Sequence, residues 1–224
     1  MMKLFVYDSP AFEAFLKNNA HERGEVKFLN SVTKEGMNAI DVGANIGISS
    51  VVIAKKIGKR GRLCSFEPVP EYFDALKENI SSNGLENVEV YELAVTDQVG
   101  RANFYQKGLS SGIIFEEGAQ KSEVSTTTVD RFLAEEKLER VDLINIDCEG
   151  SELLVLKGAK ETLRKNKVKI FCEVHHDFLE RLGQSVGDII EYLQGLGFKV
   201  QSVSLDNLSL GNDFGKCEYI YACK

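Results

Sequence analysis

From Met37 onward, short runs of apolar residues alternate with longer stretches in which apolar residues recur at helical spacing. Several runs are apolar at nearly every position, as expected for parallel strands that helices cover on both faces. This alternation predicts an α/β fold in which right-handed crossovers join parallel strands. The predicted strands are Asn38–Val42, Arg62–Glu67, Val88–Leu93, Val141–Asp147, Val168–Val174, Phe198–Ser204 and Glu218–Cys223.

The two ends of the chain depart from this alternation. The last two apolar runs are separated by Leu205–Lys216, which is rich in Asn, Asp and Gly. This segment is too polar for a crossover helix and is predicted to be a hairpin connection, so the final strand runs antiparallel. Residues 1–36 carry apolar residues at helical spacing and are predicted to form a helical extension on a single domain, residues 37–224.

Composition limits the classes of function. The 224 residues are 43% hydrophobic, enough for a full core, and no apolar run approaches the ~18 residues of a membrane span. The 34 acidic against 27 basic residues disfavour nucleic acid as a partner. The 5 cysteines show no C-x-x-C pairing, and the first residues do not resemble a signal peptide, so we expect a cytoplasmic protein without membrane insertion.

The loop after the first predicted strand, Asp41-Val42-Gly43-Ala44-Asn45-Ile46-Gly47, combines glycines with an acidic residue. Its glycines permit a tight turn and close approach of a ligand, and the helix that follows offers unpaired N–H groups. A dinucleotide-binding loop uses the same features to hold a pyrophosphate. The carboxylate of Asp41 would repel a pyrophosphate but suits the ammonium group of an amino-acid moiety, which indicates S-adenosylmethionine. A structural turn with a capping Asp is the alternative.

Two positions after the next strands extend this prediction. Glu67, in Phe66-Glu67-Pro68, follows the second strand, where an acid accepts hydrogen bonds from both ribose hydroxyls in nucleotide-binding α/β folds. Attraction of an acid to the start of the next helix is the alternative for Glu67. Ala94, after the third strand, would let an adenine ring lie against the backbone.

Further acidic and histidine residues close the fourth and fifth strands. Asp147 ends one apolar strand and is expected to point into the cleft, whereas Glu149 suits either a site or the start of the next helix. Glu173 and His175 share one face of the fifth strand by alternation, although a slip of one residue would exchange His175 with His176. With Asp147, they are predicted to form a hydroxyl-activating group or a divalent-metal site.

The segment from Gly100 to Thr127 interrupts the strand–helix alternation. Arg101–Tyr105 is predicted to be a short strand, and a polar loop, Gly108–Gly112, follows it. Polar glycine-containing loops near a site often cover it, so this loop is our candidate lid or acceptor contact.

Five motifs in order resemble the FkbM-type S-adenosylmethionine-dependent methyltransferases. The resemblance extends from about Glu25 to His176. The motifs are Asp41–Gly47, Phe66–Pro68, Thr127–Asp130, Ile146–Leu153 with Leu156–Ala159, and Glu173–His175. Relatives often have Val in place of Cys148 and Ala in place of Ser151.

The resemblance implies a class I, Rossmann-like methyltransferase sheet of seven mostly parallel strands, in the order 3-2-1-4-5-7-6 with an antiparallel last strand and helices on both faces. It implies O-methylation of a hydroxyl on a sugar or other small molecule. The residues expected to hold the cofactor are Asp41, Gly43, Asn45, Gly47 and Glu67. Asp147, Glu173 and His175 would face the acceptor.

The mechanism expected from these residues is in-line displacement at the methyl carbon of a sulfonium. His175 is the first candidate for the base, because an imidazole titrates near neutral pH, and Asp147 is the second. If a metal is required, Asp147 and Glu173 are the expected ligands. An RNA or protein methyltransferase, a nicotinamide-dependent oxidoreductase and a cofactor-binding module without catalysis are the competing hypotheses.

Overall fold

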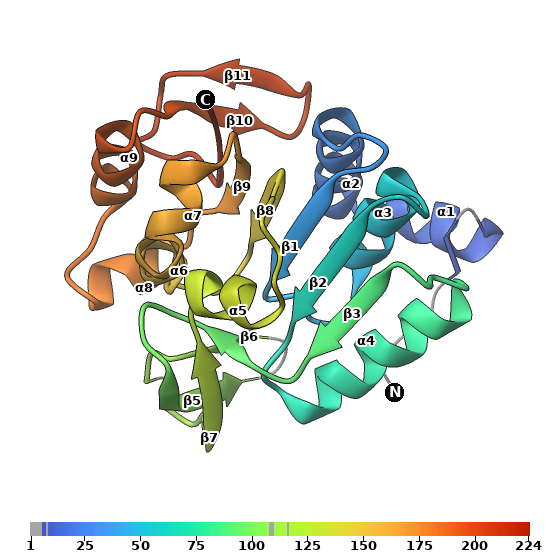
Figure 1. The fold of residues 1–224 in the computed structure, drawn as a ribbon, viewed down its shortest axis with the longest axis horizontal. Helices are drawn as coiled ribbons and strands as arrows, with labels where there is room; N and C mark the ends of the chain where they lie inside the picture. The colour runs from blue at the N-terminus through green and yellow to red at the C-terminus, as the bar shows by residue number, and fades with distance from the viewer. Residues whose placement is uncertain (1–5, 8, 108–109, 116) are drawn as a thin grey trace.

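A computed structural model of the chain describes residues 6–7, 9–107, 110–115 and 117–224. A mixed sheet of eight strands runs through the middle of the molecule, in the order β11-β10-β12-β9-β8-β1-β2-β3 (Figure 1). Its strands are β1 (Asn38–Val42), β2 (Arg62–Phe66), β3 (Val88–Tyr91), β8 (Leu143–Ile146), β9 (Lys169–Glu173), β10 (Lys199–Ser204), β11 (Ser209–Gly211) and β12 (Tyr219–Cys223).

The sheet has one strand more than the seven expected. The extra strand, β11, lies within the segment predicted to be a plain connection, and it pairs antiparallel with β10 at the sheet edge. Its three residues are too few to give an alternating pattern in the sequence. Strand β12 runs antiparallel to both β9 and β10, which confirms the predicted reversal of the final strand.

Helices cover both faces of the sheet (Figure 1). One face carries α1 (Pro10–Asn18), α2 (Ala20–Val32), α3 (Ile48–Ile57) and α4 (Pro70–Ser82). The other carries α5 (Val129–Glu135), α6 (Glu152–Gly158), α7 (Lys160–Lys165), α8 (His176–Arg181) and α9 (Val186–Gly195). The expected N-terminal helices are thus present as α1 and α2. No helix in the described part of the chain combines the length and apolar character that crossing a bilayer requires.

Strand alternation divides the core into two layers. Ile40 and Val42 of β1 face the layer beneath α5–α9, whereas Ala39 faces the layer beneath α1–α3. Asp41 lies two residues after Ala39 along the strand and therefore points to the same side, that of α3. This orientation decides what its carboxylate can reach.

A second sheet, in the order β4-β7-β5-β6, was not predicted as a unit. It consists of β4 (Ala94–Val95), β5 (Gly100–Lys107), β6 (Ser110–Gly112) and β7 (Gln120–Thr127), and it lies beside the edge where β1 and β2 end (Figure 1). The short strand expected at Arg101–Tyr105 forms part of β5. Residues 108–109 of the candidate lid lie outside the described residues, and Ser110–Gly112 is a strand rather than a loop.

Candidate active site

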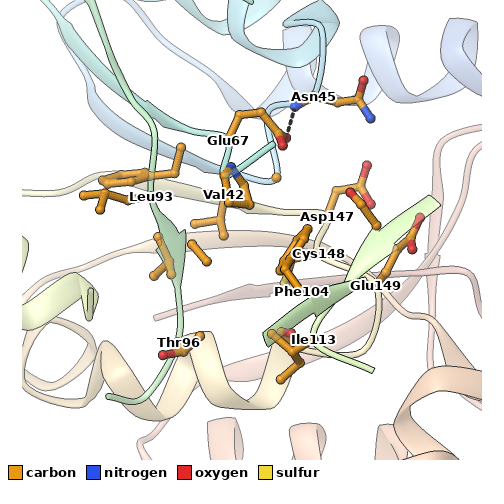
Figure 2. A pocket seen from close by; sticks show the side chains of 17 residues that line it. Val42, Asn45, Glu67, Leu93, Thr96, Phe104, Ile113, Asp147, Cys148 and Glu149 are labelled. Carbon is orange, nitrogen blue, oxygen red and sulfur yellow. Dashed lines mark hydrogen bonds between the residues drawn. The ribbon is translucent and has the colours of Figure 1, made fainter. Parts of the chain in front are cut away.

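Apart from Ala94, which lies in β4, the predicted site residues lie at or just after the carboxyl ends of four adjacent parallel strands, β2, β1, β8 and β9. At this edge of an open α/β sheet, ligands bind in the crevice between the loops. Figure 2 shows one cavity here, with Asn45, Glu67 and Asp147 projecting into the same space.

The glycine loop passes very close to the end of β8. Gly43 has a φ of +79°, and a Cβ atom built on it would lie 1.7 Å from the carbonyl oxygen of Asp147. No other residue type fits this position, because the strain of the left-handed conformation and the overlap with backbone would act together. The close approach places the glycine loop and Asp147 side by side at the carboxyl edge of the sheet.

A hydrogen bond joins Asn45 in the glycine loop to Glu67 after β2. The backbone N–H of Asn45, a residue with a φ of +50°, donates to Oε2 of Glu67 at 2.9 Å (Figure 2). The backbone N–H of Val69 donates to Oε1 at 2.8 Å. Burial raises the pKa of Glu67 to about 7, although these two hydrogen bonds oppose the shift. Each carboxylate oxygen keeps a second lone pair for a ligand hydroxyl.

Asp41 is placed differently from the prediction. Its side chain has no exposed surface, and it accepts hydrogen bonds from Ser49 (2.8 Å), Ser50 (2.5 Å) and Asn145 (2.8 Å). The carboxylate lines neither cavity of the site, so direct contact with an ammonium group is corrected to a structural role. Because Asp41 points to the α3 side of β1, it ties the start of α3 to β8 beneath the loop.

Gly47 has a packing role and lines neither cavity, and its contact with a cofactor stays a prediction. It precedes α3 with a φ of +93°, and a Cβ atom there would lie 2.6 Å from Cδ1 of Leu76 on α4. Ala94 does line the cavity, together with Leu93 and, from the second sheet, Phe104. These side chains form an apolar wall next to Glu67.

A second cavity adjoins the first. Its walls come from α1, α2, the glycine loop and the ends of β8 and β9. Three residues, Gly43, Asn45 and Asp147, line both cavities, so the two spaces meet at these positions. A ligand in one cavity can therefore present an atom to a ligand in the other at Asp147.

Two carboxylates face the second cavity from neighbouring strand ends. Asp147 is 39% exposed and Glu173 is 19% exposed. Burial and the charge of Glu173 raise the pKa of Asp147 well above its usual range, and the positive charge of His175 opposes that shift. A carboxylate with a raised pKa is a stronger base than an ordinary one.

His175, and not His176, faces the site. Its Nδ1 lies 2.7 Å from Oε1 of Glu152, whereas Nε2 of His176 lies 2.8 Å from the carbonyl oxygen of Cys217. Burial lowers the pKa of His175, but the hydrogen bond with Glu152 and the charges of Asp147 and Glu173 outweigh it and raise the pKa to about 9. A raised pKa favours the protonated imidazole at neutral pH, which makes Asp147 the stronger of the two candidates for the base; the role of His175 as the base stays a prediction.

Sequence reasoning did not identify three further side chains around the site. Glu152 has no exposed surface, and Tyr219 on β12 donates from its hydroxyl to Oε2 of Glu173 at 2.8 Å. Glu25 on α2 lines the second cavity. For Glu152, the sequence did offer a signal, because an acidic residue starts the otherwise apolar stretch Glu152–Leu156. Tyr219 and Glu25 reach the site only through the tertiary fold, so no local pattern indicated them.

The Thr127–Asp130 motif acts away from the cavities. Thr128 caps α5 by accepting from the backbone N–H of Arg131. Both carboxylate oxygens of Asp130 accept from backbone N–H groups at the start of α7, those of Glu161 and Thr162 at 2.8 Å. This motif therefore fixes two helices against each other rather than a ligand.

Together, the sheet, the glycine loop and the acid after β2 define the class I methyltransferase fold. Comparison with known families agrees, because residues 41–200 match the methyltransferase FkbM domain. The match covers well over half of the chain. The chain belongs to the methyltransferase FkbM domain family, whose members depend on S-adenosylmethionine.

Two curated relatives illustrate the similarity. The 2-O-methyltransferase NoeI of Sinorhizobium fredii is 29% identical over 147 residues, which are 57% of this chain and 59% of NoeI. The methyltransferase sdnD of Sordaria araneosa is 29% identical over 156 residues, which are 54% of this chain and 60% of sdnD. The aligned part is thus about three fifths of the length of each relative.

A solved structure shares the fold. The methyltransferase FkbM of Methylobacillus flagellatus KT superposes with a TM-score of 0.57 at 16% sequence identity. The superposition covers 85% of this chain and 43% of that protein. At this level of identity, the likeness concerns the fold alone.

The residues of the first cavity fit S-adenosylmethionine. Gly43 leaves room beside the backbone, Glu67 offers lone pairs at the place of the ribose, and Leu93 and Phe104 form an apolar wall for the adenine ring. Glu149 and Asp147 supply negative charge, and none of the described lining residues is Lys or Arg. This environment suits a sulfonium cation.

Proposed function

We propose that this protein transfers the methyl group of S-adenosylmethionine to a hydroxyl group of a neutral, polyhydroxylated small molecule such as a sugar. The observation that carries the proposal is the junction of the two cavities at Gly43, Asn45 and Asp147. The cofactor occupies the first cavity, and the acceptor occupies the second, so that the reacting atoms meet beside Asp147.

When bound, S-adenosylmethionine supplies an electrophilic methyl group. Glu67 would hold the ribose hydroxyls, and the glycine loop would leave room for the cofactor beside its backbone. Asp147 orients the acceptor hydroxyl and accepts its proton, a role that its raised pKa favours. Nε2 of His175 lies between the two carboxylates, 3.7 Å from an oxygen of Asp147 and 3.7 Å from an oxygen of Glu173.

The lining of the second cavity supports this class of acceptor. It carries the four carboxylates of Glu22, Glu25, Asp147 and Glu173, and its described lining contains no Lys or Arg. Such a surface offers no Lys or Arg to a phosphate or carboxylate, and its carboxyl groups form hydrogen bonds with hydroxyl groups. The same lack of Lys and Arg in the described lining disfavours RNA as the acceptor. The similarity to NoeI, a 2-O-methyltransferase, also supports a hydroxyl acceptor.

The test combines binding and turnover. Isothermal titration is expected to show that S-adenosylhomocysteine binds and that NADH does not. Methyl transfer from labelled S-adenosylmethionine is then measured on a panel of neutral sugars, sugar phosphates, uronic acids and RNA. Transfer to neutral polyols above all other members would support the proposal. Binding of NADH alone, or preferred transfer to RNA or phosphorylated sugars, would contradict it.

A further inference from the structure

Asp147, Glu173 and His175 form a compact group of metal-ligating side chains at the ends of β8 and β9. One ligand atom from each lies within 4.8 Å of the other two. Nε2 of His175 lies 3.7 Å from Oδ1 of Asp147 and 3.7 Å from Oε1 of Glu173. Ligand atoms at ~2.1 Å from one cation are separated by roughly 3.0–3.5 Å, so a small contraction is enough to coordinate it.

The two nitrogen atoms of His175 have different surroundings. Nδ1 makes a short contact of 2.7 Å with Glu152, whereas Nε2 stands between two carboxylates, beyond hydrogen-bonding distance of either. An internal ion pair would be expected to close to ~2.8 Å on this side as well. The spacing leaves room for an ion between Nε2 and the two carboxylates.

Glu152 is placed as the outer partner of a metal-binding histidine. It starts α6, has no exposed surface, and also accepts from the backbone N–H groups of Gly150 (3.1 Å) and His175 (3.3 Å). Metal-binding histidines almost always donate their other ring N–H to a carboxylate, carbonyl or water, which fixes the ring orientation. Glu152 gives His175 this arrangement.

Glu173 is oriented in a similar way. The hydroxyl of Tyr219, which is 1% exposed, donates to Oε2 of Glu173 at 2.8 Å. Oε1 remains directed toward Nε2 of His175. Glu152 thus holds His175, and Tyr219 holds Glu173. Each of these buried neighbours leaves one possible ligand atom, Nε2 of His175 or Oε1 of Glu173, facing the space between the ligands.

We propose that Asp147, Glu173 and His175 bind one divalent metal cation, with Glu152 and Tyr219 orienting two of the ligands. Two carboxylate oxygens and one imidazole nitrogen suit Mn²⁺ and similar cations, and they leave coordination positions open. Asp147 and Glu173 also line the acceptor cavity, so the open positions face the acceptor.

The role of this cation in methyl transfer rests on the function proposed above, whereas the binding of the cation does not. A cation that ligates the acceptor hydroxyl lowers the pKa of that hydroxyl. The O–H bond breaks, and its proton passes to the oxygen of Asp147 that does not ligate the cation. The hydroxyl oxygen forms a bond to the methyl carbon as the bond between that carbon and sulfur breaks. The products are the methyl ether and S-adenosylhomocysteine.

The test titrates Mn²⁺ into protein freed of metal by dialysis against a chelator, without cofactor or acceptor, and follows the ion by electron paramagnetic resonance. One Mn²⁺ per chain is expected to bind, with a nitrogen coupling in the pulsed spectrum. His175→Gln is expected to abolish the nitrogen coupling, and Glu173→Gln to abolish saturable binding. Glu152→Gln is expected to weaken binding by about 10- to 100-fold.

Glu22→Gln is the matched control, because Glu22 lines the same cavity outside the ligand group. Thermal unfolding and binding of S-adenosylhomocysteine show that each variant is folded. Absence of saturable Mn²⁺ binding to the wild-type protein would overturn the metal site, as would equal binding by the Glu173→Gln and Glu22→Gln variants. If S-adenosylhomocysteine binds and Mn²⁺ does not, the metal site is wrong and the proposed function stands. If Mn²⁺ binds and S-adenosylhomocysteine does not, the proposed function is wrong and the metal site stands.

Discussion

Nδ1 of His175 lies 2.7 Å from Oε1 of Glu152, a carboxylate with no exposed surface at the start of α6. The two residues are 23 positions apart in the sequence and come from successive strand–helix units. This contact fixes the orientation of the imidazole ring, so its other nitrogen faces Asp147 and Glu173. The chemistry proposed for this edge of the sheet therefore depends on Glu152, a buried side chain that does not itself contact a ligand.

Asp147→Asn should abolish most methyl transfer while leaving cofactor binding intact. The amide cannot accept the proton of the acceptor hydroxyl, and loss of a general base costs about 10²- to 10⁴-fold in rate. We expect kcat/KM to fall by this factor and the affinity for S-adenosylhomocysteine to stay unchanged. Asp74→Asn, which changes an exposed carboxylate on α4 outside both cavities, serves as the control. Full turnover by Asp147→Asn would exclude Asp147 as the base.

Gly43→Ala should disrupt the site, whereas Gly36→Ala should be tolerated. Both glycines have nearly the same positive φ, +79° and +78°, but only Gly43 would clash with neighbouring backbone. Strain alone costs about 1–2 kcal/mol. We expect Gly36→Ala to lower the free energy of unfolding by that amount and keep cofactor binding.

For Gly43→Ala, calorimetry should show no binding of S-adenosylhomocysteine, and thermal unfolding should occur at a clearly lower temperature than in Gly36→Ala. Similar behaviour of the two variants would show that the close contact with the carbonyl of Asp147 does not shape the loop.

Binding of S-adenosylhomocysteine should strengthen as the pH rises from 6 to 8. Burial raises the pKa of Glu67 to about 7, with the charges of Asp41 and Glu149 adding to the shift. The ribose hydroxyls need the ionised carboxylate, so below this pKa the group must first lose a proton. The affinity should then change by up to about tenfold per pH unit below pH 7 and level off above it.

Glu67→Gln is the control for this titration. Its amide cannot ionise, so its affinity should be lower at pH 8 and nearly independent of pH. A wild-type affinity that is constant between pH 6 and 8 would mean that Glu67 does not change its protonation on binding.

Ser50→Ala should destabilise the fold more than Ser49→Ala. The hydroxyl of Ser50 is fully buried and lies 2.5 Å from Asp41, whereas Ser49 is only partly buried. Removing a buried partner of a carboxylate costs about 1–3 kcal/mol. Urea denaturation should show a loss of this size for Ser50→Ala. Equal losses for the two variants would contradict the burial of Asp41 as the cause.

The sequence was most informative where local chemistry is decisive. Parallel strands covered on both faces are mostly apolar, so β1, β2 and β9 could be located from short runs of apolar residues. The helix cap at Ser185 is likewise local, because Ser185 and Asp188 form a capping box within four residues. The second sheet escaped prediction because much of β7 is exposed and polar, which gives no apolar run.

The sequence alone determined which acidic and glycine residues gather at the carboxyl edge of the sheet, because the parallel strands that precede them all end there. Only the tertiary structure decided what each one does. It buried Asp41 behind the glycine loop, since the direction of a side chain depends on the register of its strand. It also brought Glu152, Asp147 and Glu173 to His175, and together these three carboxyl groups outweigh the effect of burial and raise the pKa of the imidazole. Such pKa values depend on neighbours in space, and the order of residues along the chain does not specify them.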